Sequence, residues 1–325
     1  MDNRLTVLVP CRNEEVTIER KIKDLLKSTK DIYKVIIVDD YSSDQTAKIV
    51  KNLVKKYQKL TYLKNSFGKG KASAIRAGIK QARTDLIAIT DADVWIEAGS
   101  LKKMIKQFNK PEVGMVGADL KSIKKNLKTG RMNMAMKLSD ELFHRIRLFL
   151  SRVDSLPLLH MQLVVIRKSI GVYPRIGIRA DDVDTAIRMR LRGYKTILAP
   201  NAWFLQTVSD KDDFTKRLRR DGGTIATLWQ YRYLLFNLRY GKYGLICFPV
   251  CFGLYFIQPF LVILFLLLPW LFLSNLLKAV YFIIILNVES LQKLVFYDVT
   301  LILAIVKTLF SKGTVVDSWS TVRKS

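Results

Sequence analysis

Apolar and polar positions alternate along the first two thirds of the chain in blocks that predict strands and helices in turn. The expected strands are residues 5–10, 35–40, 60–64, 86–91 and 113–120, and the expected helices lie near 14–28, 44–57, 70–83 and 98–109. This alternation is typical of an α/β fold in which helices sandwich a mostly parallel sheet. Ligands of such sheets bind beyond the carboxyl ends of the strands.

Apolar side chains at helical spacing also predict a helix over residues 130–152. Its apolar face either packs on the core, which we favour, or lies on a bilayer, since Lys and Arg flank that face. Two later strands are expected at residues 162–167 and 196–203.

The C-terminal quarter is much more apolar than the rest. No charged residue occurs from Gly244 to Leu273, and only four occur from Ala279 to Phe310. A helix that crosses a bilayer needs about 20 apolar residues, so we expect two spans, or three, within residues 244–310. Three prolines, Pro249, Pro259 and Pro269, should kink the first stretch.

These patterns divide the chain into four parts. Residues 1–223 form the predicted α/β domain, and residues 224–243 form an interfacial amphipathic segment with Trp229, Tyr231, Tyr233 and Tyr240 at headgroup depth. Residues 244–310 form the transmembrane region, and residues 311–325 form a cytoplasmic tail.

Charge predicts the orientation of these parts. The whole chain has 54 Lys and Arg residues and 28 Asp and Glu residues. Six of these bases and three of these acids follow Tyr243, so the first 243 residues carry a net charge of 48 − 25 = +23. Because positive segments stay on the cytoplasmic side, we expect an integral membrane protein whose globular part lies in the cytoplasm. The bases are scattered over helix faces such as Lys21, Lys23 and Lys27. This distribution favours attraction to anionic lipid headgroups and predicts no nucleic-acid partner.

Two acids, Asp91 and Asp93, end the apolar run of residues 86–90. Side chains at positions i and i+2 of an extended segment point to the same side, so both carboxylates could face one ligand. Hard oxygen ligands suit Mg2+ or Mn2+. An isolated D-x-D is weak evidence, because turns after strands are rich in Asp.

Three further segments precede it in order: Pro10-Cys-Arg-Asn-Glu14, Val38-Asp-Asp-Tyr-Ser-Ser-Asp44 and Gly68-Lys-Gly-Lys-Ala72. Together with the D-x-D, over roughly residues 4–223, they resemble the family 2 glycosyltransferases of the GT-A fold. A dinucleotide-binding Rossmann fold is the rival with the same alternation. The first strand, however, runs into no G-x-G-x-x-G fingerprint.

The resemblance implies an inverting transfer of sugar from a nucleoside diphosphate sugar, with a UDP-sugar favoured and Mg2+ or Mn2+ as cofactor. It implies that Pro10, Arg12 and Glu14 line the nucleotide pocket and that Asp40 contacts the base or the ribose. Lys69 or Lys71 would contribute from the adjoining loop. Asp91 would contact the ribose or the metal, and Asp93 would be the principal metal ligand. We expect Asp39 to be structural, since it should point away from Asp40. Asp44 is ambiguous, because it could simply cap the following helix.

Two later motifs complete the resemblance. Asp181-Asp182 matches the family's acidic motif, which implies that Asp182 is the catalytic base and that Asp181 supports it; plain capping of a helix is the alternative. Residues 216–220 resemble the Q-x-x-R-W segment of membrane-bound polysaccharide synthases, with Lys216 for Gln, Arg219 for Arg and Arg220 for Trp. The match implies that Arg219 and Arg220 lie beside the donor diphosphate. The alternative is that this segment is only a solvated basic face of a helix.

We therefore expect a membrane-anchored glycosyltransferase whose acceptor is a lipid-linked or membrane-proximal glycan, or a polyprenyl phosphate. The alternative enzyme is a processive polysaccharide synthase, against which the loss of the Trp counts. A non-catalytic membrane scaffold that keeps the fold is the alternative from another class.

Overall fold

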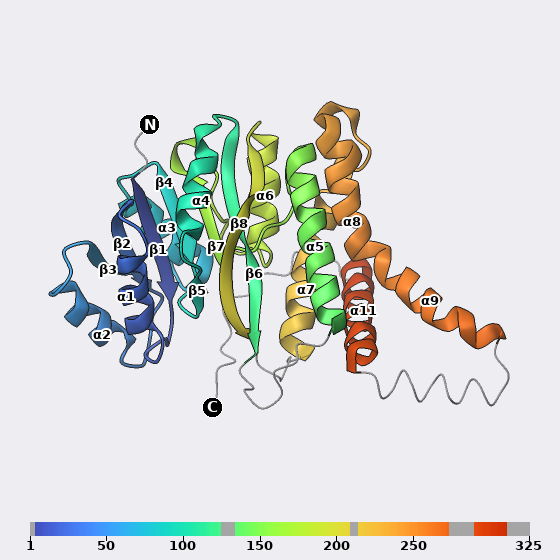
Figure 1. The fold of residues 1–325 in the computed structure, drawn as a ribbon, viewed down its shortest axis with the longest axis horizontal. Coiled ribbons are helices and arrows are strands. Elements are labelled where there is room, and N and C mark those ends of the chain that lie inside the picture. Colours follow the sequence, from blue (N-terminus) through green and yellow to red (C-terminus); the bar gives the residue numbers. More distant parts are fainter. Residues whose placement is uncertain (1–3, 125–133, 209–213, 273–288, 311–325) are drawn as a thin grey trace. The chain divides into compact units, whose positions relative to one another are not determined.

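The computed structural model describes residues 4–124, 134–208, 214–272 and 289–310 (Figure 1). Two compact units make up the chain. Of the described residues, 4–124 and 147–208 form the first, an α/β unit, and 134–146, 214–272 and 289–310 form the second, a helical unit.

One sheet of eight strands forms the centre of the α/β unit, in the order β3-β2-β1-β4-β7-β6-β8-β5 (Figure 1). The strands are β1 (Leu5–Cys11), β2 (Ile32–Asp39), β3 (Leu60–Lys64), β4 (Leu86–Thr90), β5 (Val94–Ile96), β6 (Val113–Lys124), β7 (Leu163–Arg167) and β8 (Lys195–Val208). β1 runs parallel to β2 and β4, β2 to β3, and β6 to β8. Because β7 is antiparallel to β4 and β6, and β5 to β8, the sheet is mixed: four of its seven strand pairs are parallel and three are antiparallel.

Helices cover both faces of the parallel half of the sheet. α1 (Ile18–Ser28), α2 (Thr46–Val54) and α4 (Ser100–Lys106) share one buried core with alternate residues of β1, such as Val7 and Val9. α3 (Lys71–Gln81) packs on the opposite face, where a Cβ at Gly78 would lie 3.0 Å from Leu8 Cδ2. This close approach explains the glycine in the middle of a helix. α6 (Asp181–Leu191) follows β7 and packs against β6 and β8.

The four helices and seven strands expected from the sequence of this part are all present, with shifted ends. α1 begins at Ile18 and not near residue 14, since Asn13 has a φ of 56° and the chain turns before the helix starts. The sequence pattern missed β5, which has only three residues. Short helical turns are η1 (Gln107–Asn109), η2 (Lys168–Ile170), η3 (Arg232–Leu234), η4 (Leu238–Tyr240) and the π-helical η5 (Tyr243–Cys247).

α5 (Met134–Val153) confirms the helix expected over residues 130–152. Its apolar residues do not all face a core. Leu150 is buried and Arg147 forms a bidentate pair with Asp119 at 2.7 and 2.9 Å, whereas Leu142 and Phe149 are more than half exposed. The favoured core-facing interpretation therefore holds only for part of the described helix.

The helical unit contains α7 (Phe214–Gln230), α8 (Phe248–Phe256), α9 (Gln258–Phe272) and α11 (Glu289–Phe310). α7 continues through residue 223, where we expected the α/β domain to end. It packs on α11 through Ile225, Leu301, Ala304 and Ile305. Trp229 stacks near Phe252 and Phe256, with ring centroids 6.5 and 5.7 Å apart, so this residue of the expected interfacial segment is packed inside the unit.

Among the described residues, no single helix is both long and apolar enough to cross a membrane, but one bent pair of helices passes that test together. The pair consists of Tyr243–Phe256 and Gln258–Leu268, and the chain bends by 50° between them. Pro259 lies just after the break, and its ring and missing N–H prevent a continuous helix there. Residues 273–288 lie outside the described residues, so the number of spans stays a prediction.

Candidate active site

Two polar loops meet at the carboxyl ends of β1 and β2, where the first sequence motifs fall. Asn13 N donates to Ser42 Oγ at 3.0 Å, and Ser43 N donates to Asn13 Oδ1 at 2.8 Å. Glu15 N donates to Asp44 Oδ2, and Gln45 N donates to Glu15 Oε2. These reciprocal bonds fasten the loop after β1 to the loop after β2. Arg12 and Glu14 belong to the loop they fix, and Pro10 is buried within β1.

Backbone strain is concentrated at the same edge. Asn13 and Tyr41 have φ values of 56° and 59°, a left-handed conformation that costs a bulky residue such as Tyr41 energy. Strained backbone of this kind is found preferentially at functional sites. Asp44 helps to hold this part of the backbone in place. Besides the bond from Glu15 N, its Oδ1 accepts from Thr46 N at the start of α2. Although partial desolvation acts in the opposite direction, these hydrogen bonds lower the pKa of Asp44. Its described contacts hold the loop of Glu15 and the start of α2.

Asp40 is wholly buried and organises the Gly-Lys loop. Gly70 N donates to both of its oxygens at 2.9 and 3.0 Å, and Asn65 Nδ2 donates to Oδ1 at 2.7 Å. Gly68 and Gly70 have φ values of 88° and 130°, which favour glycine. The contacts shown by Asp40 are thus to its own chain, and its predicted role towards a base or ribose stays a prediction. Asp39 points elsewhere, as expected: Tyr62 Oη donates to it at 2.9 Å.

The loop held by Asp40 brings Lys71 to the D-x-D. Lys71 Nζ lies 2.5 Å from Asp91 Oδ1, and both side chains are about four-fifths buried. Lys69 lies on the same loop, with its ammonium 5.8 Å from the ring of Tyr41. Burial alone would favour a neutral Lys71, but Asp91 and Asp181 outweigh it and raise the pKa of Lys71 above its ordinary value.

Asp91 and Asp93 do not lie in an extended segment. β4 ends at Thr90, and Asp91-Ala92-Asp93 form the turn that leads into β5. The period-two argument used for the sequence therefore does not apply, although both acids are partly exposed and Ala92 is buried. The turn, rather than strand alternation, determines where the two carboxylates point.

Asp181 and Asp182 join this group of acids from the first turn of α6. Burial, then Asp182 and Asp91, raise the pKa of Asp181 to about 7, and Lys71 opposes them. Asp182 Oδ1 accepts from Val183 N at 2.8 Å within this turn, whereas the N-cap position is Ala180, which makes no side-chain cap bond. The fold also brings the acidic motif into electrostatic contact with Asp91, which a capping role alone would not require.

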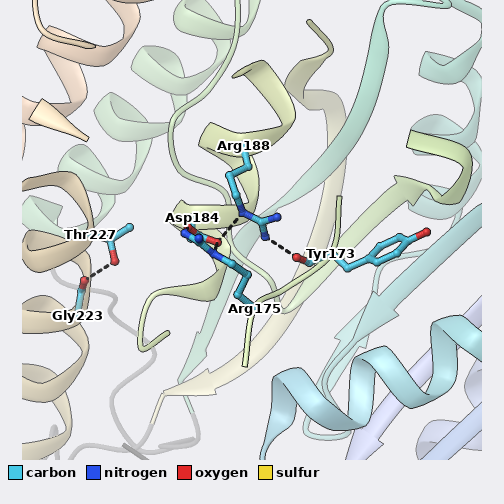
Figure 2. A network of polar contacts seen from close by, with 6 residues as sticks. All are labelled: Tyr173, Arg175, Asp184, Arg188, Gly223 and Thr227. Atoms are coloured by element: carbon cyan, nitrogen blue, oxygen red, sulfur yellow. Dashed lines mark hydrogen bonds and ion pairs between the residues drawn. The ribbon is translucent and has the colours of Figure 1, made fainter. Parts of the chain in front are cut away.

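Asp184 has a different role from Asp182. It is wholly buried, and Figure 2 shows its carboxylate between the guanidinium groups of Arg175 and Arg188. Arg175 Nε donates at 3.0 Å and Arg188 Nε at 2.8 Å, while Arg188 also donates to the carbonyl of Tyr173. The network fastens the loop before α6 to that helix and thereby positions the Asp181-Asp182 pair.

Arg219 and Arg220 lie on α7 in the helical unit, and both are exposed. Their neighbour Arg217 stacks on Tyr297 with its guanidinium carbon 3.5 Å from the ring centroid, and it pairs with Asp221 at 3.3 Å. Arg217 and Asp221 therefore hold α7 to α11. Either a diphosphate-binding role or a plain surface role is compatible with the exposure of Arg219 and Arg220.

The donor set at the D-x-D fits a hard divalent ion. Among the described residues no group of three or more His, Cys, Asp or Glu side chains is arranged to hold a metal on its own. Mg2+ is usually held by one or two carboxylates together with substrate phosphates and water, which matches Asp91 and Asp93. The ammonium of Lys71 against Asp91 shows that this carboxylate already attracts a cation.

Sequence reasoning missed one charged group beneath this turn. Lys21 is 3% exposed, whereas the scattered lysines of this helix were expected to be solvated. Its Nζ donates to Thr90 Oγ1 at 2.9 Å and to the Val94 carbonyl at 2.6 Å. The signal that could have found it is the apolar stripe of α1, in which Ile18, Ile22 and Leu25 are buried on the same face as Lys21.

Comparison with known proteins decides the family. The model of "Glycosyl transferase family 2" matches residues 6–170, about half of the 325 residues. The chain belongs to glycosyl transferase family 2. It is therefore a glycosyltransferase, and the matched residues contain the two cross-linked loops, the Gly-Lys loop and the D-x-D turn.

Curated relatives are similar over part of their length. Poly-beta-1,6-N-acetyl-D-glucosamine synthase of Staphylococcus aureus is 27% identical over 207 residues, which are 62% of this chain and 50% of the relative. Probable glycosyltransferase YdaM of Bacillus subtilis is 39% identical over 95 residues, 28% of this chain and 23% of the relative. This glycosyltransferase spans about half the length of the synthase that it matches.

A solved structure extends the likeness of fold. Mannosyltransferase PcManGT from Pyrobaculum calidifontis, in complex with GDP-Man and Mn2+, has a TM-score of 0.74 and 22% identity, and the match covers 95% of this chain and 88% of that one. This confirms a GT-A-like α/β fold with a mixed sheet.

The Asp184 network yields the first prediction. Asp184→Asn should lower the free energy of unfolding by about 2 kcal/mol, because it leaves two arginines without a buried counter-charge. The loss is smaller than for a fully buried ion pair, since Arg175 and Arg188 are partly exposed. Thermal unfolding followed by circular dichroism measures it. Asp24→Asn, which breaks the exposed pair with Arg20, is the control and should leave the melting temperature unchanged. Equal melting temperatures for the two variants would contradict a structural role for Asp184.

Proposed function

We propose that this glycosyltransferase moves a sugar, with inversion, from a nucleoside diphosphate sugar to a lipid-linked or membrane-proximal acceptor. The observation that carries the proposal is the convergence of Lys71, Asp91, Asp181 and Asp182 at the carboxyl edge of the parallel strands. Parallel α/β sheets bind their ligands at this edge. A diphosphate and its cation would complete a site in which Lys71 already offsets part of the charge of three acids.

The proposed donor site lies along this edge. Pro10, Arg12 and Glu14 would border the nucleotide, and the Gly-Lys loop would place Lys69 and Lys71 beside it. Asp91 and Asp93 would hold Mg2+ or Mn2+, which when bound offsets the negative charge of the diphosphate. The complex of the structural neighbour PcManGT with GDP-Man and Mn2+ supports a divalent cation. We favour a UDP-sugar as donor.

Asp182 would act as general base. In this step Asp182 takes the proton of the acceptor hydroxyl, the oxygen forms a bond to the anomeric carbon, and the bond from that carbon to the diphosphate oxygen breaks. Burial and the adjacent Asp182 raise the pKa of Asp181, so this carboxyl holds a proton more readily than an ordinary one and adds less negative charge beside Asp182. Arg219 would pair with the departing diphosphate in a bidentate way.

A membrane location is part of the proposal. The bent pair of helices in the helical unit and the exposed apolar side chains of α9, among them Phe260, Leu264 and Phe265, support it. The positive charge of the first 243 residues favours a cytoplasmic catalytic unit. A second candidate is a processive polysaccharide synthase, which the similarity to the Staphylococcus aureus synthase favours. The replacement of Trp by Arg220 speaks against it.

Orientation is directly testable. Protease added to intact cells should leave the α/β unit uncleaved, because we place that unit in the cytoplasm, and the same protease should cleave it after detergent lysis. Immunoblotting with an antibody against the α/β unit measures both results. Cleavage in intact cells would overturn the cytoplasmic placement without affecting the assignment as a glycosyltransferase.

A donor screen tests the function as a whole. The purified full chain with Mn2+ or Mg2+ should transfer sugar from UDP-sugars, more than from GDP-sugars, to a lipid extract, and the labelled product should partition into organic solvent. EDTA and Asp93→Asn should each abolish turnover, and Mn2+ should restore only the EDTA-treated wild type, because that variant has lost a ligand. Full activity in excess EDTA would refute the metal assignment, and a water-soluble polymer would favour the synthase.

The role of Asp182 can be separated from donor binding. Asp182→Asn is nearly isosteric, so UDP affinity measured by calorimetry should stay almost unchanged, while sugar transfer should fall at least about a hundredfold, as for a lost general base. Asp24→Asn serves again as the control. Near wild-type transfer by Asp182→Asn would mean that the base lies elsewhere, and Asp181→Asn would then be the next variant to measure.

A further inference from the structure

Lys21 occupies a position where an apolar side chain is expected. The buried face of α1 consists of Ile18, Lys21, Ile22 and Leu25, and Lys21 is 3% exposed. An ammonium in such a place is costly unless its protons are donated to acceptors and its charge is balanced. Burial lowers the pKa of Lys21 to about 8, while Asp91 and Asp93 act in the opposite direction.

The acceptors of Lys21 flank the D-x-D on both sides. Thr90, the last residue of β4, accepts through Oγ1 at 2.9 Å, and Val94, the first residue of β5, accepts through its carbonyl at 2.6 Å. A single ammonium thus bridges the two ends of the three-residue turn Asp91-Ala92-Asp93. Thr90 is wholly buried and so is Val94, so water cannot easily replace these bonds.

We propose that Lys21 is a positioning residue which clamps the D-x-D turn so that Asp91 and Asp93 face the donor diphosphate and its cation. The inference rests on the proposed function, since it concerns how that site is held. Lys21 does not itself touch the substrate. It acts through Thr90 and Val94, and it does so from α1, an element outside the sequence motifs of the family.

Two effects of Lys21 on metal affinity have opposite signs. Its positive charge repels a divalent cation, so charge alone predicts that a neutral residue at position 21 tightens metal binding. Its hydrogen bonds fix the carboxylates, so positioning predicts that the same change weakens metal binding. The bonds at 2.6 and 2.9 Å are direct, whereas the turn separates the ammonium from the ligands. We therefore expect the loss of positioning to outweigh the loss of repulsion, so that removing the ammonium of Lys21 weakens metal binding. Tighter metal binding would instead show that the charge effect dominates.

The test compares two methionine variants of the full chain on the same helix. Lys21→Met should raise the Mn2+ concentration needed for half-maximal UDP binding by about tenfold, the usual loss when an outer partner of a metal ligand is removed. UDP affinity in EDTA should stay unchanged, which a general folding defect would not allow. Lys23→Met is the matched control, because Lys23 is exposed and pairs only with Glu19 at 2.7 Å among the contacts described, and it should behave as wild type. Calorimetry gives UDP binding, and electron paramagnetic resonance of free Mn2+ gives metal binding independently of turnover.

A second variant covers the case in which Lys21→Met does not fold. Thr90→Val keeps the shape of the side chain and the ammonium but removes one of its two acceptors, so it should raise the Mn2+ requirement by about threefold, less than full removal. An unchanged or lower Mn2+ requirement in Lys21→Met would overturn the clamp. If Lys21→Met does not fold, the same result in Thr90→Val would overturn it. If Mn2+ does not strengthen UDP binding by the wild type, the proposed metal site fails and the clamp fails with it.

Discussion

The candidate site depends on balancing negative charge in a confined place. Asp91, Asp93, Asp181 and Asp182 come from a turn and a helix start that are far apart in the sequence, and the sheet brings them to one edge. Four carboxylates cannot share a partly buried space without cations. Lys71 supplies one at 2.5 Å from Asp91, and Lys21 supplies another from below the turn. Burial, with Asp182 and Asp91 beside it, still raises the pKa of Asp181, and Lys71 opposes them.

The two lysines balance this charge in different ways. Lys21 is bonded to neutral acceptors within the core and has little freedom to move, whereas Lys71 is about one-fifth exposed and pairs directly with a predicted metal ligand. In our proposal Lys71 lies beside the donor, and Lys21 keeps the turn of Asp91 and Asp93 in place.

Sequence reasoning predicted the helices and strands of the α/β unit better than the contacts of its motif residues. The alternation of apolar runs predicted β1 to β4 and α1 to α4, because each buries one regular face. The antiparallel direction of a strand such as β7 was not predictable from apolar runs, since a buried strand has the same pattern in either direction. The capping alternative for Asp44 agrees with its bond from Thr46 N. The contacts of Asp40 were hidden, because only the folded loop brings the N–H of Gly70 within its reach.

The same reasoning shows why the family motifs extend beyond groups that would touch a ligand. Asn13, Glu15, Ser42 and Asp44 join two loops, and Asp40 joins a third, so that the backbone of residues 12 and 69–71 is fixed before any donor arrives. Preorganised groups act on charge without rearranging, which is the main source of electrostatic stabilisation in enzymes. The left-handed backbone of Asn13 and Tyr41 is maintained by these bonds. In this glycosyltransferase the motif residues thus build the edge, and a lysine outside the motifs, Lys21, completes it from the core.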